Sequence, residues 1–278
     1  MMTTAYALRG GKHGARRLDL LAQVMGRSTE ALLDTAGVGP GMTAVDVGCG
    51  AGHVSRALAE RVGPDGHVLG LDFDPVKLDT ARRQARRAGL ENVEYRVLDV
   101  TTWIEPDSYD VVYGRFIVSH LAGRETLVAR MVAALRLHGV LVVEDIDFSG
   151  AFCQPTNPAY DRYCELYTRV VARKGGDANV GMELYRMCLD AGLSDAHVSL
   201  VQPIQGGRSA EKELTLSTMI NIADSVVLEE VASREECDGV IEELTEYTRD
   251  PHTVVACPRV FQVWGRKTAP ARALTASR

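Results

Sequence analysis

The sequence predicts an α/β fold with a doubly wound parallel sheet, and three observations support that prediction. Apolar runs of strand length alternate with helical patterns between residues 43 and 145. A turn with three alternating glycines follows the first run, and later runs end in carboxylates. Regular alternation of strand and helix requires crossover connections, which make neighbouring strands parallel. We expect strands near 43–47, 67–71, 93–97, 109–113 and 139–145, and helices near 53–62, 75–88, 101–104 and 124–136.

The first strand leads into the string Asp46-Val47-Gly48-Cys49-Gly50-Ala51-Gly52, with glycine at alternate positions. Glycine lacks a Cβ, so this turn can adopt positive φ and let a ligand approach the backbone. The N–H groups that open the next helix face the same crevice. The dinucleotide fingerprint needs glycine at position 53, where His53 stands, and no phosphate loop is present. A turn with a purely structural role is the alternative.

Two further strands also end in acidic residues. Val68-Leu69-Gly70-Leu71-Asp72 places a carboxylate 20 residues after Gly52 (72 − 52), and the run from Val93 ends in Asp99. In related sheets an acid at the first of these positions accepts hydrogen bonds from ribose hydroxyls. Three carboxylates at successive strand ends therefore predict a nucleoside site at the carboxyl edge of the sheet.

Together these motifs resemble those of the class I S-adenosylmethionine-dependent methyltransferases. The resemblance implies a Rossmann-like, seven-stranded, mostly parallel sheet with an antiparallel last strand. It also implies S-adenosylmethionine as cofactor, S-adenosylhomocysteine as product, no metal, and contact of Asp99 with the adenine amino group. The implied cofactor-binding residues are Asp46, Gly48, Cys49, Gly50, Gly52, His53, Asp72, Phe73, Lys77, Asp99, Val100 and Arg115.

The segment from Tyr109 to Leu121 is similar to the fourth strand and following loop of the ubiquinone/menaquinone-biosynthesis-type methyltransferases. In that family the strand end lies next to the sulfonium of the cofactor. The resemblance makes Arg115 a candidate partner of the methionine carboxylate and His120 a candidate general base. A histidine that only caps the loop is the alternative for His120. Leu137-His138-Gly139 departs from the family's usual Pro-Gly-Gly, which affects a turn and not the chemistry.

The chain is expected to have four parts. They are an N-terminal helical cap (1–39), a cofactor-binding core (40–149), a segment that completes the core (150–265) and a disordered tail (266–278). The cap is expected to hold two helices, the second beginning at Ser28 and ending at Gly37. Tyr6 is a candidate to line the site, and an aromatic that packs on the body is the alternative.

Helical insertions near 150–179 and 206–250 are expected to form a lid over the strand ends. Between and after them the pattern predicts a helix at 180–191, a strand near 195–204 and a last strand at 262–265. The candidate substrate contacts are Glu144, Asp147, Tyr160, Tyr163, Asn221 and Asp224. The alternatives are solvated acids and an aromatic stripe that packs in the core.

Composition sets limits on the class of protein. The chain has 278 residues and a net charge of −6, which gives no general attraction to nucleic acid. Its six cysteines show no C-x-x-C spacing, and its histidines form no metal motif, so we expect reduced thiols and no metal. The N-terminus lacks the apolar segment of a signal peptide, and no apolar run spans a bilayer. We therefore expect a cytoplasmic protein.

The sequence thus predicts a methyltransferase that resembles bacterial small-molecule, natural-product enzymes. We expect an aromatic or indole-like acceptor, methylated on carbon, nitrogen or oxygen, with no nucleic-acid or membrane partner. A homodimer is left open. The alternatives are a methyltransferase for RNA or protein and a non-catalytic module that binds the nucleoside.

Overall fold

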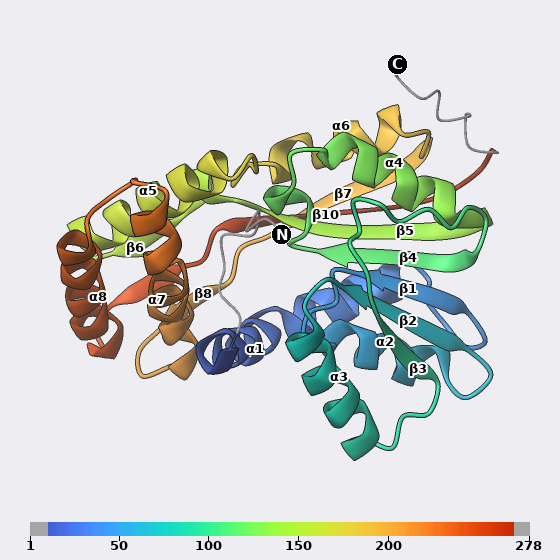
Figure 1. Cartoon of the computed structure of the whole chain (residues 1–278), viewed down its shortest axis with the longest axis horizontal. Helices are drawn as coiled ribbons and strands as arrows, with labels where there is room; N and C mark the ends of the chain where they lie inside the picture. The colour runs from blue at the N-terminus through green and yellow to red at the C-terminus, as the bar shows by residue number, and fades with distance from the viewer. Residues whose placement is uncertain (1–10, 270–278) are drawn as a thin grey trace.

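A seven-stranded sheet forms the body of the computed structural model, which describes residues 11–269 (Figure 1). Its strands are β1 (Thr43–Val47), β2 (His67–Asp72), β3 (Val93–Val97), β4 (Tyr109–Arg115), β5 (Leu135–Asp147), β7 (Asp195–Val201) and β10 (Arg259–Arg266). Their order is β3-β2-β1-β4-β5-β10-β7. The first five are parallel, and β10 runs antiparallel to both of its neighbours. The expected doubly wound sheet with an antiparallel last strand is confirmed.

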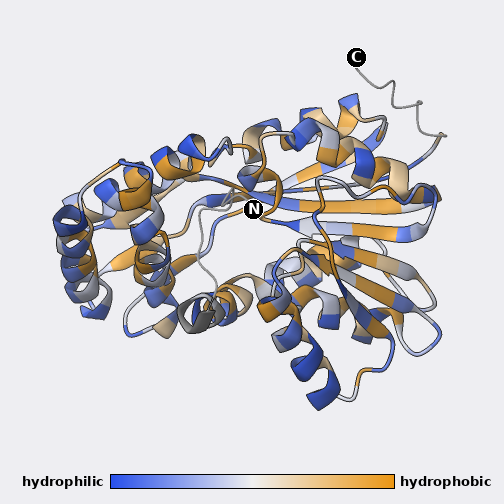
Figure 2. Cartoon of the chain, in the orientation of Figure 1, coloured by the Kyte–Doolittle hydropathy of each residue, from blue (hydrophilic) through white to orange (hydrophobic). Residues whose placement is uncertain are grey.

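The helices either cover the two faces of this sheet or form a separate cluster beyond it. They are α1 (Gly11–Thr35), α2 (His53–Val62), α3 (Pro75–Arg87), α4 (Arg124–Ala134), α5 (Pro158–Arg173), α6 (Gly181–Asp190), α7 (Glu213–Leu228) and α8 (Arg234–Arg249). Side chains of α4 and α6 share one core with Val45 and Val47, whereas α2 and the end of α1 share another with Ala44. Figure 2 shows the apolar residues concentrated in the central strands and the polar ones on the outer helices. The two cores result from the alternation of side chains along each strand.

A separate core holds the C-terminal helical cluster, which consists of α5, α7 and α8 and lies beyond the carboxyl ends of the sheet (Figure 1). A three-stranded sheet of β6 (Phe152–Gln154), β9 (Val254–Ala256) and β8 (Ile204–Gly206) packs with it. Helix α1 contacts α7, so the N-terminal helix joins the cluster to the main sheet. This small sheet was not predicted, because three-residue strands carry too short a pattern to recognise.

The N-terminal cap differs from the prediction. The two expected helices are one continuous helix, α1, in which Ser28 donates its hydroxyl to the Met25 carbonyl instead of capping a new helix. Glycine at position 26 costs about 1 kcal/mol relative to alanine inside a helix. Packing of α1 against α2 and α7 outweighs that cost. The helix ends near Gly37 as expected, with φ at +73°.

Two other expectations were wrong. Residues 101–104 form a turn and not a helix, because the Asp99 carboxylate accepts hydrogen bonds from both the backbone N–H and the hydroxyl of Thr101. The strand expected near 195–204 is split into β7 and β8. Pro203 lies between them and has no N–H to donate to a ladder.

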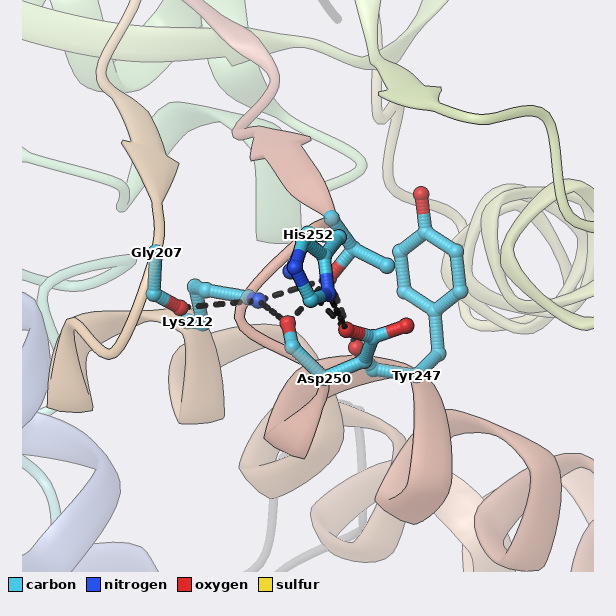
Figure 3. Close-up of polar contacts among 6 residues, drawn as sticks. Gly207, Lys212, Tyr247, Asp250 and His252 are labelled. Carbon is cyan, nitrogen blue, oxygen red and sulfur yellow. Dashed lines mark hydrogen bonds and ion pairs between the residues drawn. The ribbon is translucent and has the colours of Figure 1, made fainter.

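A buried lysine, Lys212, links segments of the C-terminal helical cluster by hydrogen bonds (Figure 3). Lys212 ends the short helix η3 (Ala210–Lys212) and is only 1% exposed. Its ammonium donates to the Asp250 carbonyl and the Thr253 hydroxyl, both at 2.6 Å, and to the Gly207 carbonyl at 3.3 Å. Thr253 in turn donates to the Tyr247 carbonyl. The positive charge therefore joins the start of α7 to the C-terminal end of α8, where a helix dipole favours cations.

Replacing Lys212 with Met is expected to lower the free energy of unfolding by about 1–2 kcal/mol, because buried acceptors lose their donor. Urea unfolding followed by circular dichroism measures the change. Arg208→Met is the matched control, since Arg208 is an exposed cation four residues earlier. Equal stabilities for the two variants would show that the buried contacts of Lys212 contribute nothing.

The described residues give three further results. Across 11–269, no helix is both long and apolar enough to cross a membrane. In the same range, no group of three or more His, Cys, Asp or Glu side chains is arranged to hold a metal ion. All six cysteines are free thiols.

Candidate functional site

A cavity of about 900 Å³ opens at the carboxyl ends of β1, β2 and β4. One half is formed by the ends of β1 and β2 and the loops that follow β1, β2 and β3, and the other by α1, α5, α7 and the connection into β10. Residues from the segments 113–121 and 146–148 also line the cavity. Such cavities occur where strand order reverses in a doubly wound sheet, and β1 with β4 forms that reversal here. The site therefore lies between the sheet and the C-terminal helical cluster.

The glycine turn is held in place by the neighbouring strand. The N–H groups of Gly48 and Cys49 both donate to the Leu71 carbonyl at 2.8 Å. Gly48 and Gly50 have φ of +77° and +54°, in the region that favours glycine. A Cβ at Gly48 would lie 3.0 Å from the Ile117 side chain, which itself lines the cavity. Because glycine has no side chain, the backbone at these positions borders the cavity directly.

Asp72 links two loops of the site. Its carboxylate accepts one hydrogen bond from the Gly50 N–H and another from the Asp74 N–H, each at 2.9 Å. Asp74 then caps α3 by accepting from the Val76 N–H. Asp72 is 5% exposed and lines the cavity, so the same carboxylate that orders the turn also faces a ligand. Asp99 lines the cavity nearby and is more exposed.

Asp46 lies deeper, at the end of β1. It is buried and accepts a hydrogen bond from the Ser55 hydroxyl at 2.6 Å. Burial raises its pKa to about 6, although the Ser55 bond and the charge of Arg115 act in the opposite direction. The carboxyl is thus mostly ionised at neutral pH and anchors the first turn of α2.

The arrangement of Arg115 depends on a buried polar network. Arg115 lines the cavity and donates to the Thr29 hydroxyl at 3.0 Å. Thr29 donates to Glu144, which also accepts from the Tyr113 hydroxyl and the Gln262 amide. Glu144 is fully buried and its carboxylate is held by these three donors. The network connects α1, β4, β5 and β10 and holds one terminal nitrogen of the Arg115 guanidinium.

His120 lies in the short helix η1 (Val118–His120), in the wall of the cavity. It is 3% exposed. Burial lowers its pKa to about 3, and the positive charges of Arg17 and Lys77 add to this effect. The imidazole is therefore neutral at physiological pH.

Comparison with known proteins identifies the family. A methyltransferase domain model matches residues 39–184, which is more than half of the chain. This chain belongs to the methyltransferase domain family. The resemblance derived from the glycine turn and the strand-end acids is thereby confirmed.

Two relatives and one solved structure illustrate the match. Trans-aconitate 2-methyltransferase of Methylobacterium radiotolerans is 34% identical over 158 residues, 55% of this chain and 54% of that protein. The ubiquinone/menaquinone biosynthesis C-methyltransferase of Vibrio campbellii is 27% identical over 156 residues, 54% of this chain and 60% of that protein. A crystal structure of a Bacillus halodurans putative methyltransferase shares the fold, with a TM-score of 0.59 and 19% identity over 87% of this chain and all of that one. This chain spans about half the length of the curated relatives it matches.

The methyltransferase domain brings together most residues that the sequence suggested for the cofactor. The cavity lining contains Asp46, Gly48, Cys49, Gly50, His53, Asp72, Phe73, Lys77, Asp99, Val100 and Arg115. Gly52 is not among the lining residues. A Cβ there would lie 2.6 Å from the Tyr95 hydroxyl and 2.8 Å from the Ala81 Cβ, so this glycine permits packing against α3 and β3.

The suggested substrate residues are mostly elsewhere. Tyr163 lines the cavity, whereas Glu144, Asp147, Tyr160, Asn221 and Asp224 do not. Each of these has another role: Asp147 pairs with Arg259, the Tyr160 hydroxyl donates to the Ala256 carbonyl, and Asp224 pairs with Arg234. Asn221 is buried and donates within α7 to the Ser217 carbonyl. Tyr6 lies outside the described residues.

Several lining residues were not predicted as site residues. Helix α1 contributes Arg17, Leu18, Leu21 and Val24, and α7 contributes Leu214, Thr215 and Thr218. The helical spacing of the α1 residues was visible in the sequence but also fits a face packed on the core. Phe148, from the short helix η2 (Phe148–Gly150), stacks on Tyr167 with ring centroids 4.1 Å apart. No sequence motif marks this pair.

Proposed function

We propose that this chain transfers a methyl group from S-adenosylmethionine to a small, planar, largely apolar acceptor. Membership of the methyltransferase family supports the reaction class. The cavity at the strand ends, with the glycine turn and Asp72 on one side and apolar helix faces on the other, is the observation that carries the proposal. Its volume is within the range of sites that bury small ligands.

The half of the cavity at the ends of β1, β2 and β3 suits an adenosyl group. In the proposal, Asp72 accepts hydrogen bonds from the ribose hydroxyls and Asp99 contacts the adenine. The open backbone at Gly48 and Gly50 admits the ligand closely, and Arg115 binds the methionine carboxylate through a charge-assisted pair. When bound, the cofactor supplies an already activated methyl group on a sulfonium.

Because the donor is activated, the chain's own task is alignment and exclusion of water. Holding two reactants in line is worth about 7–11 kcal/mol of barrier lowering. We propose that α5 and α7 act as the lid that completes this enclosure. His120, with a pKa of about 3, is a weak proton acceptor. We therefore propose that it contacts the acceptor as a neutral hydrogen-bonding group instead of a strong base.

Titration calorimetry with S-adenosylhomocysteine tests the first step and is expected to show 1:1 binding to the purified chain. A panel of aromatic acids, phenols, indoles and amines, followed by release of S-adenosylhomocysteine, tests the second. No uptake by folded protein would refute the proposal. Binding without turnover across the panel would indicate a nucleoside-binding module that lacks catalysis.

A further inference from the structure

The two halves of the cavity differ in charge. The carboxylates that line it, Asp46, Asp72, Asp74 and Asp99, all come from the ends of β1 and β2 or from the loops after β2 and β3. In the described part of the chain, the half built by α1, α5, α7 and the connection into β10 contributes no carboxylate to the lining. Arg17 is the charged side chain of that half. We call the half built by α1, α5, α7 and the connection into β10 the acceptor half. Its lining is therefore largely apolar and carries one positive charge.

The guanidinium of Arg17 is held in place without being neutralised. Its Nε donates to the Thr218 hydroxyl at 3.1 Å, and that hydroxyl donates in turn to the Leu214 carbonyl at 2.7 Å. The adjacent acid of α7, Glu213, pairs with Arg16 on the exposed side. Among the described residues, no carboxylate lies within ion-pair distance of Arg17. A half-buried arginine in this setting lacks a counter-charge that a ligand can supply.

The positive charge of Arg17 affects the pKa values of two other residues in the cavity wall. Its charge lowers the pKa of His120, and it acts against the rise that burial causes in the pKa of Tyr163. Both residues line the same cavity as Arg17. Lys77 adds a second positive charge near His120. A cationic ligand would meet repulsion here, whereas an anion would be stabilised.

Resting on the proposed methyl transfer, the geometry points to an organic acid as the acceptor. Its anionic group pairs with Arg17, and its planar apolar body lies against the stacked Phe148 and Tyr167. Arginine presents a planar fork that matches a carboxylate in a bidentate pair. Tyr167 of α5 and Phe148 of η2 both line the cavity, and their ring planes are 13° apart, so the stack offers the acceptor a planar apolar surface.

The test compares acids with their neutral isosteres. Benzoate, naphthoate and anthracene carboxylate are titrated against the protein saturated with S-adenosylhomocysteine, each beside its carboxamide. The best acid is expected to bind at least 10-fold more tightly than its amide. In Arg17→Met this preference is lost, in Arg17→Lys it is partly retained, and in the matched control Arg16→Met it is unchanged.

Affinity for S-adenosylhomocysteine is measured on every variant and is expected to stay within about twofold of the parent. This separates the two proposals, because failure to bind the cofactor product refutes the methyltransferase assignment itself. With cofactor binding intact, three results would overturn the role of Arg17: equal binding of acid and amide, a preference that survives in Arg17→Met, or no binding by any acid.

Discussion

Replacing Asp72 with Ala is expected to lower the affinity for S-adenosylhomocysteine by about 100-fold. Hydrogen bonds to a charged group contribute about 1.5–3 kcal/mol each, and two ribose hydroxyls would lose their acceptor. A loss of about 3 kcal/mol corresponds to roughly that factor. The substitution also removes the acceptor of the Gly50 and Asp74 N–H groups, so the glycine turn loses its main restraint. Titration calorimetry measures the affinity.

Two variants give this experiment its controls. Asp65→Ala removes an exposed carboxylate in the turn before β2 and is expected to leave affinity unchanged. Asp72→Asn keeps the shape but turns one acceptor into a donor, which then faces the N–H of Gly50 or Asp74. It should bind more weakly than the parent although it fills the same volume. Unchanged affinity in a folded Asp72→Ala protein would remove this residue from the site.

The cofactor half of the site and the main sheet were predictable because their signals are local. A strand, a glycine turn and a helix start follow one another between Thr43 and His53, and each is encoded by neighbouring residues. The rule that parallel strands present their carboxyl ends at one edge then places Asp72 beside the turn. The structure has this arrangement, with the Asp72 carboxylate 2.9 Å from the Gly50 nitrogen.

The acceptor half was not predictable because its parts are distant in the chain. Arg17 and Thr218 are 201 positions apart, and only the packing of α1 on α7 brings them together. The aromatic stripe of α5 illustrates the same limit. Tyr163 and Tyr167 line the cavity, whereas Tyr160 is turned to the Ala256 carbonyl. Spacing identifies the face of a helix, but it does not show whether that face meets a cavity or a core.

Replacing His120 with Gln is expected to reduce the sensitivity of the fold to acid. The pKa of His120 is about 3 in the folded chain, against the ordinary value of 6.5 expected once the chain unfolds. Between these values the unfolded chain binds a proton that the folded chain does not. The contribution of His120 to the free energy of unfolding is therefore fully present above about pH 6.5 and is lost as the pH falls towards 3.

Between pH 7 and pH 5 the parent should lose about 2 kcal/mol more than the variant, at about 1.4 kcal/mol per pH unit. Asp46 and Asp145 have raised pKa values near 6, which favour the folded state as the pH falls. Both are present in the two proteins, so their effect cancels in the comparison. Urea unfolding at the two pH values gives the difference, and parallel losses in parent and variant would mean that His120 already titrates normally in the folded chain.

The same variant separates the two roles of His120 once an acceptor is known. Glutamine can hydrogen-bond but cannot take up a proton, and loss of a general base slows a reaction by about 10²–10⁴-fold. The low pKa of His120 leads us to expect a decrease of less than about tenfold in methyl transfer. In this interpretation the charges of Arg17 and Lys77, which add to the effect of burial in keeping the imidazole neutral, also favour the ionised form of an acidic acceptor. The positive charges would then favour deprotonation of the acceptor, which otherwise requires a general base.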